Sequence, residues 1–144
     1  MAVRYVDYEL GEGAKAPYKK YVGDAGWDLF VSRDAEIPPQ SSVDVHTDIK
    51  IKMPPYTYAR ITGRSSTLKR YGLLVNEGII DNGYTGELFI QIKNLTNKTV
   101  IVRKGTRLAQ MLFHVIEDIR WSEVDEIKPI PGKRGDDGFG STGE

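Results

Sequence analysis

Asp81 is the side chain in this sequence that is best placed to act as a base. It follows the apolar run 78–80 and begins the turn Asp81-Asn82-Gly83, beyond which a second apolar run starts. This turn chemistry between two apolar runs predicts a tight hairpin. A carboxylate held in a rigid turn can orient and deprotonate a water molecule. Tyr84, just after the turn, could form a flat wall against a sugar, but an ordinary turn is the alternative for both residues.

Arg64, Ser65 and Ser66 form a second group, at the point where the pattern changes from a strand to a short helix. A guanidinium, two hydroxyls and the amide groups of a helix N-terminus together suit an anion. The same residues would also make an ordinary helix start, with Ser65 or Ser66 as the N-cap and Arg64 on the surface. Taken alone, the group is compatible with an anion site and with a simple cap.

Two further polar residues adjoin apolar strands. Asp28 lies in the segment 25–29 beside Gly26, where an aspartate is most often a turn residue at a strand boundary. Gln110 lies near the start of an apolar run, and a buried glutamine needs hydrogen-bonding partners. Gln110 is therefore either a hydrogen-bonding residue of the core or a ligand contact.

The C-terminal segment 128–144 differs in kind from the rest of the chain. It contains two prolines, five glycines and a single aromatic residue, Phe139. Such a segment cannot bury enough apolar area to become ordered by itself, so it is either a frayed tail or an arm that orders on a ligand. In an arm, glycine amides, the hydroxyls of Ser141 and Thr142, and the Arg134 guanidinium would suit phosphates. Phe139 could stack on a base.

Alternating apolar and polar residues predict strands through most of the chain. The predicted strands are 42–53, 87–95, 99–103 and 108–116. Only residues 65–74 could form a helix, of one or two turns. Many short strands with one short helix predict an all-β sandwich, barrel or jelly roll. We place this domain at residues 1–127 and the arm at 128–144.

Composition indicates an ordinary soluble domain. The chain has 144 residues, and its hydrophobic and charged fractions of 40% and 28% lie in the globular range. Twenty basic and twenty acidic residues cancel, so no large positive field is available for nucleic acid. The absence of cysteine excludes disulfides and thiolate metal sites. We expect no signal peptide or membrane span, and a cytoplasmic location, or a nuclear one for a eukaryotic or viral source.

Five motifs follow one another in a fixed order. They are AGWDL at 25–29, GRSS at 63–66, GIIDNGYTGEL at 78–88, GTRLAQ at 105–110 and RGDDGFGSTG at 134–143. In this order the chain resembles the trimeric dUTPase family, the deoxyuridine triphosphate nucleotidohydrolases, over nearly its whole length. The resemblance implies a distorted jelly roll in a homotrimer with shared active sites. It also implies that dUTP is hydrolysed to dUMP and pyrophosphate with Mg²⁺, which removes dUTP from the nucleotide pool and supplies dUMP for dTTP synthesis.

The resemblance also assigns roles to single residues. Asp81 corresponds to the base whose water attacks the α-phosphorus, and Asp28 to an aspartate that reaches Mg²⁺ through water. Tyr84 corresponds to the aromatic residue beneath the deoxyribose, and Ser66 stands where the family commonly has glycine. Arg64, Ser65 and Ser66 correspond to the motif that a neighbouring subunit contributes to hold the phosphates. The implied substrate contacts are Arg64, Ser65, Ser66, Asn76, Gly78, Ile79, Ile80, Tyr84, Gln110, Arg134, Phe139, Gly140, Ser141 and Thr142.

Two alternatives to dUTP hydrolysis are open. The dCTP deaminases, some of them bifunctional, share the fold and the Arg-Ser-Ser spelling. They carry a glutamate five residues after the last glycine of the 78–86 motif, where this chain has Gln91, which cannot exchange a proton as a carboxylate does. A non-catalytic dUTP-binding regulatory module is the other alternative. The retention of Asp81, Arg134 and Phe139 argues against it.

Overall fold

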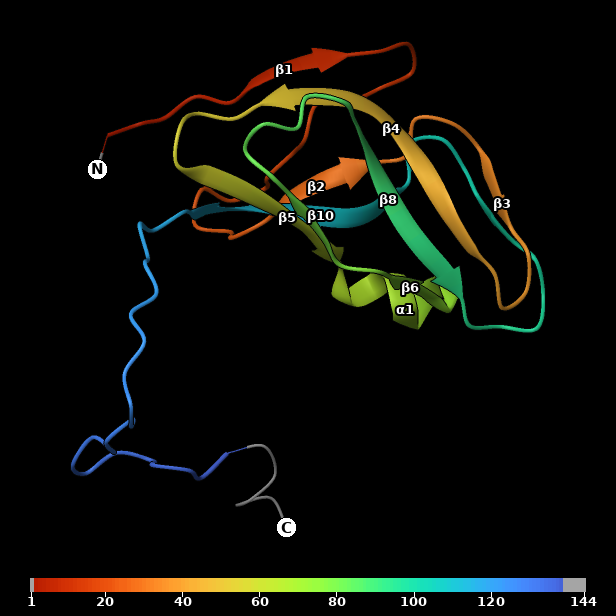
Figure 1. Ribbon diagram of the computed structural model, residues 1–144. Coiled ribbons are helices and arrows are strands. Elements are labelled where there is room, and N and C mark those ends of the chain that lie inside the picture. Colours follow the sequence, from red (N-terminus) through yellow and green to blue (C-terminus); the bar gives the residue numbers. More distant parts are fainter. Residues whose placement is uncertain (1, 139–144) are drawn as a thin grey trace.

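The computed structural model describes residues 2–138, which form an all-β body with one short helix and an extended C-terminal segment (Figure 1). The strands are β1 (Asp7–Leu10), β2 (Trp27–Phe30), β3 (Ala35–Ile37), β4 (Ser42–Lys52), β5 (Thr57–Gly63), β6 (Leu73–Val75), β7 (Gly78–Ile80), β8 (Glu87–Asn94), β9 (Val100–Val102) and β10 (Arg107–Val115), and the helix is α1 (Ser65–Tyr71). Within the described part of the chain, no helix has the length and apolar character needed to cross a membrane.

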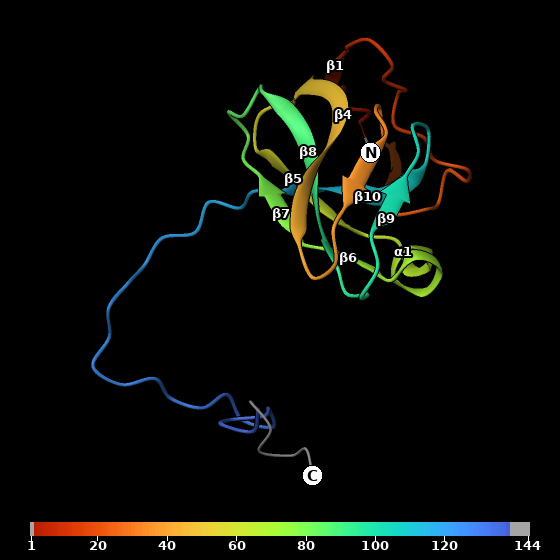
Figure 2. The same ribbon diagram turned by 90° about the vertical axis from the view of Figure 1, so that its right-hand side faces the viewer.

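Two four-stranded antiparallel sheets form the body. Their strand orders are β1-β4-β8-β6 and β2-β10-β5-β7, and β3 and β9 make a separate two-stranded sheet. The two larger sheets lie as layers (Figure 2). Aliphatic side chains of both sheets pack into one buried core. The most deeply buried of these side chains include Leu29, Ile49, Ile61, Leu88, Ile90, Leu108 and Met111. The predicted fold class, an all-β jelly roll, is confirmed.

The alternation in residues 42–53 predicts β4 correctly. Val45, Ile49 and Ile51 are buried, whereas the intervening lysines are exposed to solvent. Side chains of a strand point alternately to its two faces, so one face of β4 covers the core and the other meets water. The predicted strands at 87–95, 99–103 and 108–116 correspond in the same way to β8, β9 and β10.

The short helix lies where the sequence predicts it, but its cap does not. Arg64 is the N-cap residue, with extended backbone angles (φ −86°, ψ 147°) and no side-chain capping bond, so the prediction of Ser65 or Ser66 as N-cap is wrong. Both serines lie inside the first turn and are exposed. Thr67, the next residue, donates a hydrogen bond from its hydroxyl to the Leu108 carbonyl at 2.7 Å. This buried contact to β10 holds the first turn of the helix, whose N-cap lies one or two residues earlier than the serine pattern suggests.

The turn at Asp81 connects two sheets and does not close a two-stranded hairpin. β7 pairs with β5, whereas β8 pairs with β4 and β6, so the strands flanking the turn belong to different sheets. The hairpin prediction is therefore wrong, although the turn itself is present, with the Tyr84 amide donating to the Asp81 carbonyl at 3.0 Å. Local turn chemistry favours the reversal, but the partners of each strand are decided by burial on the two sheets.

The chain leaves the body after β10. From residue 116 to residue 138 it has neither helix nor strand, and both views show it running away from the two sheets (Figures 1 and 2). The last strand thus ends at Val115, and the boundary between domain and arm at residues 127 and 128 stays a prediction.

β4 contains a bulge opposite β8. The register shifts between His46 and Lys50, and Asp48 has a positive φ of 53°. The Asp48 carboxylate accepts hydrogen bonds from the Ser32 hydroxyl at 2.6 Å and from two nitrogens of Arg33 at 2.9 and 2.8 Å. These bonds, that from Arg33 above all, hold the pKa of Asp48 below its ordinary value. The loop that follows β2 therefore stabilises the bulge through a charged contact.

The depressed pKa of Asp48 predicts an acid-dependent loss of stability. Because the folded pKa lies below the ordinary value of 3.8, ionised Asp48 stabilises the fold fully above that value, and the stabilisation is lost as pH falls through the folded pKa. Asp48→Asn should lower the urea midpoint of unfolding at neutral pH. On going to about pH 3, the midpoint of the variant should fall by less than that of the wild-type protein. An equal fall of the urea midpoint in both proteins would contradict the stabilising role of ionised Asp48.

Candidate active site

A polar cleft lies between the loop 18–26, β2, the start of α1 and β10. Its volume is about 420 Å³. Its lining residues are Tyr18, Lys19, Lys20, Asp24, Ala25, Gly26, Asp28, Arg64, Ser65, Ser66, Arg107 and Gln110. Four cationic side chains therefore face two carboxylates. The structure thus gathers five residues that the sequence singles out, and the excess of positive charge suits a polyanion.

Asp28 is paired with two arginines. Its carboxylate lies 3.0 Å from Nε of Arg64 and 3.6 Å from Nη1 of Arg107, and only a fifth of its side chain is exposed. Arg64 also donates to the Arg107 carbonyl at 3.2 Å. Asp28 is part of β2 itself, so it orients both guanidiniums from a rigid strand. Their remaining N–H groups are available to an anion in the cleft.

Gln110 reaches the cleft from β10, where it pairs in register with Asp28 of β2. Its amide nitrogen donates to the Gly63 carbonyl at 3.0 Å. A Cβ on Gly26 would collide with the Gln110 amide oxygen and lie 3.1 Å from its Cδ. A side chain at position 26 would thus displace the Gln110 amide from the cleft, and Gly26 allows the loop to approach it closely.

Sequence reasoning missed five charged or aromatic residues of the cleft, of which Arg107 contacts the Asp28 carboxylate; the others are Tyr18, Lys19, Lys20 and Asp24. Simple alternation along a strand puts Arg107 and Gln110 on opposite faces. The register of β10 against β2 shifts between Arg107 and Ala109, and this irregularity lets both side chains line the cleft. The Arg107 guanidinium also lies over the rings of Tyr18 and Phe30, at 5.5 and 5.8 Å. The arginine inside the fourth motif was the available signal, because a strand arginine beside a glutamine has no place in an apolar core.

The Asp81 turn is anchored at its tip. The Asn82 side-chain amide donates to the carbonyls of Pro54 and Thr57, at 2.9 and 2.7 Å. β7, which leads into the turn, is paired with β5 as far as Ile80. Asp81 itself is exposed, and its carboxylate has no hydrogen bond or ion pair with another described residue. The arrangement presents an unpaired carboxylate on a fixed backbone.

Tyr84 folds back over the end of the same turn. Its hydroxyl donates to the Glu87 carbonyl at 2.6 Å. A Cβ on Gly86 would lie 2.7 Å from that hydroxyl and 2.9 Å from the ring carbon that carries it. A side chain at position 86 would thus push the tyrosine ring aside, and Gly86 together with the Glu87 carbonyl allows the ring its observed position.

Asn76 and Gln91 lie side by side between β6 and β8. The Asn76 backbone amide donates to the Gln91 carbonyl at 2.8 Å, and the two side-chain amides are also hydrogen-bonded, Nδ2 to Oε1. Gln91 is thus a neutral partner of Asn76. The structure places no carboxylate at this position, where a deaminase would require one.

The cleft and the Asp81 turn lie at opposite ends of β5. Ala59 pairs with Ile80 near the start of the strand, and Arg64 follows directly after its end. Asp81 lies level with the residue before Ala59, and about six residues of β5 lie between that level and Arg64. At about 3.3 Å per residue, the two residues are roughly 20 Å apart along the sheet. One chain therefore does not bring the predicted base and the predicted phosphate residues together.

Of the substrate contacts predicted in the C-terminal arm, the described residues include one, Arg134. Arg134 donates from Nε to the Asp137 carbonyl at 2.9 Å, a contact within the arm. The predicted contacts Phe139, Gly140, Ser141 and Thr142 lie outside the described residues.

The fold and the site together define a jelly-roll protein with a cationic cleft and an exposed carboxylate turn. A family profile for dUTPase matches residues 12–143. The deoxyuridine 5′-triphosphate nucleotidohydrolase of Clostridium kluyveri is 38% identical, with 93% of this chain and 94% of the relative covered. That of Paramecium bursaria Chlorella virus 1 is 37% identical, with 94% of both chains covered.

Solved structures agree with these relatives. The dUTPase of Staphylococcus bacteriophage 80alpha, determined with dUpNHpp, has a TM-score of 0.86 and 26% identity, and the likeness covers 99% of this chain and all of that one. The chain belongs to the dUTPase family of hydrolases.

Proposed function

We propose that the protein hydrolyses dUTP to dUMP and pyrophosphate, with Asp81 as the base that activates the attacking water. The observation that carries the proposal is the exposed, unpaired carboxylate on a turn that Asn82 anchors to the neighbouring loop. A base needs a free lone pair, which this carboxylate has, and the anchored turn holds the backbone from which it projects. Attack on the α-phosphorus removes dUTP from the nucleotide pool and yields dUMP for dTTP synthesis.

The edge of β7 suits the recognition of uracil. β7 is the last strand of its sheet and pairs on one side only, with β5. The unpaired backbone amides and carbonyls of Gly78, Ile79 and Ile80 can therefore hydrogen-bond the polar edge of a base. A Cβ on Gly78 would meet no atom within 4 Å, so the space beside this edge is open. Asn76 lies next to the start of the strand and completes the donor set. Tyr84, held over the end of the turn, would lie against the deoxyribose.

The cationic cleft suits the triphosphate. Arg64 and the first-turn residues Ser65 and Ser66 offer a guanidinium, hydroxyls and free helix amides. Gln110 lies beside them, and Arg107 adds a second guanidinium that Asp28 orients. These groups neutralise charge on the phosphates and hold the chain of phosphorus atoms for in-line attack.

The donor set of the cleft fits Mg²⁺ only together with the nucleotide. Magnesium takes oxygen ligands, keeps several waters and is usually held by one or two carboxylates plus substrate phosphates. Asp28 and Asp24 are the carboxylates of the cleft, and Asp28 already contacts two guanidiniums. Asp28 would therefore reach the ion through a water molecule. The ion would supply charge neutralisation on the triphosphate.

The separation of the two half-sites along β5 supports a site shared between subunits. If one chain supplies the Asp81 turn and a neighbour supplies the cleft, no rearrangement of β5 is needed. We propose a homotrimer with three such sites, in which the arm closes over the nucleotide. Arg134 would contact the γ-phosphate, Phe139 would cover the uracil, and residues 140–142 would follow the phosphates.

Apolar surface on the extended segment 116–128, between β10 and the arm, supports assembly. Trp121 is fully exposed, and Ile119 and Ile127 are more than two-thirds exposed. The body offers a complementary hollow of about 620 Å³, lined mainly by apolar residues, in which Arg4 is the one formally charged side chain among the described lining residues. Residues 116–128 carry five acidic and two basic groups, and they contain no glycine or proline that would turn this segment back onto its own body. The lining of the hollow includes none of the cationic cleft residues and not Asp81, so we assign it to assembly rather than to chemistry.

The two tryptophans allow this assembly to be tested. Trp27 lines the hollow and Trp121 lies on the segment 116–128, so Trp27→Phe leaves Trp121 as the single indole reporter. We expect its emission to be blue-shifted and protected from acrylamide at concentrations where light scattering gives a trimer, because burial removes the indole from water. An indole that stays fully accessible in the trimer would contradict the role of this segment in assembly.

Product analysis separates the proposed reaction from its rival. With Mg²⁺, purified protein should release pyrophosphate from dUTP and no ammonia from dCTP, since Gln91 replaces the acid/base carboxylate of a deaminase. Ammonia from dCTP would establish deamination. Tight dUTP binding without pyrophosphate would favour a regulatory module.

A further inference from the structure

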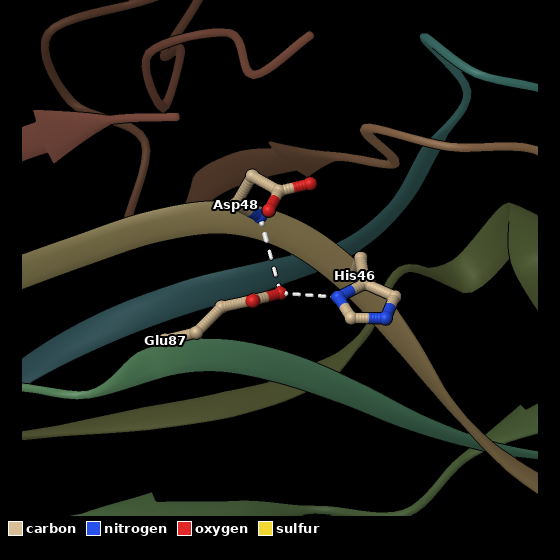
Figure 3. A group of neighbouring side chains, drawn as sticks. All are labelled: His46, Asp48 and Glu87. Atoms are coloured by element: carbon tan, nitrogen blue, oxygen red, sulfur yellow. Dashed lines mark hydrogen bonds and ion pairs between the residues drawn. The ribbon is translucent and has the colours of Figure 1, made fainter. Parts of the chain in front are cut away.

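His46, Asp48 and Glu87 form a charged group on the face of the β4–β8 pair, outside the proposed site (Figure 3). Their ligand atoms lie within 4.8 Å of one another, a spacing that could hold a cation. Each acid nevertheless has a protein partner. The Asp48 carboxylate is bound by Ser32 and Arg33, and Glu87 is bound by His46. Arg33 already supplies the positive charge, so we assign no metal to the group.

Glu87 connects this group to the catalytic turn. Its backbone carbonyl accepts the hydrogen bond from the Tyr84 hydroxyl at 2.6 Å. Its side chain accepts a bond from Nδ1 of His46 at 2.7 Å and a longer one from the Asp48 amide at 3.4 Å. Figure 3 shows both side-chain contacts converging on one carboxylate oxygen. One residue therefore holds the tyrosine and is itself held by β4.

The end of the turn needs such a hold because the flanking strands do not pair with each other. The start of the turn is fixed by β5 and by Asn82, whereas its end is fixed by the first residue of β8. Glu87 pairs with Lys50 across the bulge, so the next register position on β4 is His46, opposite Phe89. Between these two pairs the ladder is irregular, and the Glu87 side chain spans the gap.

The bulge places the donors that Glu87 requires. The positive φ of Asp48 turns its amide toward Glu87, and the Thr47 hydroxyl donates to the Leu88 carbonyl at 2.5 Å. The His46 ring also packs on Phe89, with ring centres 5.1 Å apart. His46 is thus held by a ring contact on one side and a charged acceptor on the other.

We infer that His46 and Glu87 are positioning residues for Tyr84, acting from β4 through the Glu87 backbone on the aromatic wall of the sugar pocket. The inference rests on the proposed function, because it needs Tyr84 to lie against the deoxyribose. Asp81 is anchored separately, at the start of the turn. Loss of the His46–Glu87 bond should therefore weaken sugar recognition more than it slows the chemical step.

The test compares three variants. His46→Ala removes the donor, whereas His46→Asn keeps an amide N–H at the same number of bonds from Cα as Nδ1. The matched control is Arg103→Ala, which breaks an exposed ion pair to Asp34 far from the turn. We expect His46→Ala to raise KM for dUTP and to reduce the preference for dUTP over UTP, each by about 5-fold, the loss of roughly one hydrogen bond. The kcat of His46→Ala should change little. His46→Asn should recover most of the loss in KM and in dUTP preference, and Arg103→Ala should resemble the wild-type protein.

A double-mutant cycle decides whether His46 acts through Tyr84. In a Tyr84→Phe background, which lacks the hydroxyl donor, His46→Ala should have no further effect on dUTP preference. Additive losses would overturn the inference, and so would a fall in melting temperature with unchanged preference. If His46→Ala does not fold, Glu87→Gln serves in the same cycle.

The NMR chemical shifts of the Tyr84 ring in the unliganded protein separate this inference from the proposed function. These chemical shifts should change in His46→Ala and stay the same in Arg103→Ala. Unshifted resonances would overturn the inference even if dUTP is hydrolysed. Shifted resonances in a protein that leaves dUTP intact would refute the proposed function alone.

Discussion

Asp81→Asn should abolish hydrolysis while leaving the nucleotide bound. The amide has no basic lone pair for a proton from water, and a general base contributes a factor of about 100 to 10,000. We expect kcat to fall by that factor. The Kd for a non-hydrolysable analogue should change little, because the proposed contacts to base and phosphates are made by other residues. Single-turnover kinetics and calorimetry with dUpNHpp measure the two quantities separately.

The control for this substitution is Asp44→Asn. Asp44 is an exposed carboxylate on β4, so its loss changes the net charge equally without touching the turn. It should leave both kcat and Kd at wild-type values. If Asp81→Asn weakened binding as much as hydrolysis, Asp81 would have a structural role in the turn and the base would have to be sought elsewhere.

Removal of residues 133–144 should have the second-largest effect. The truncated chain loses the Arg134 guanidinium and the predicted cover formed by Phe139 and residues 140–142. Loss of a charged donor to the reacting phosphates typically costs about 100-fold in rate or more, and an open site also admits water. We expect kcat/KM for dUTP to fall by at least about 100-fold.

The same truncation should leave the folded body intact. The hydrogen bonds of Lys133, Arg134 and Asp137 are made within the arm, to Ile130 and among themselves. The thermal melting curve should therefore overlay that of the full chain. The single substitution Arg134→Ala is the matched control, since it retains the chain length and should show part of the rate loss. Full activity of the truncated protein would remove the arm from the mechanism.

The fold could be predicted from the sequence wherever one face of a strand is buried. The odd-numbered apolar positions of β4 are the clearest case, because the two-residue period of a strand leaves one orientation that covers the core. The helix at 65–74 was predictable in position, but its cap was not. The burial of Thr67 against β10 set the helix start, and that contact joins residues 41 positions apart.

Part of the cleft was predictable from the sequence. Asp28, Arg64 and Gln110, which the motifs single out, come together in one cleft. Arg107 escaped the prediction because a register shift in β10 changes the face on which it lies. The resemblance implies that Arg64, Ser65 and Ser66 serve the site of a neighbouring subunit, and the pairing of β5 with β7 places Asp81 at the far end of β5 from these residues.

His46 shows the limit of motif reasoning most clearly. In the sequence it is one of two isolated histidines, without metal-ligand spacing, and a strand residue is the natural interpretation. It is a strand residue, but a bulge and the pairing of β4 with β8 bring it to Glu87, at the end of the third motif. Such a contact depends on tertiary pairing, and no local pattern encodes it.

The central claim is that Asp81 directs water to the α-phosphorus of dUTP. Hydrolysis in water enriched in oxygen-18, followed by mass spectrometry of both products after one turnover, tests it most directly. Attack at the α-phosphorus predicts that the label appears in dUMP and that pyrophosphate stays unlabelled. Label in pyrophosphate would show attack at the β-phosphorus and would contradict the claim.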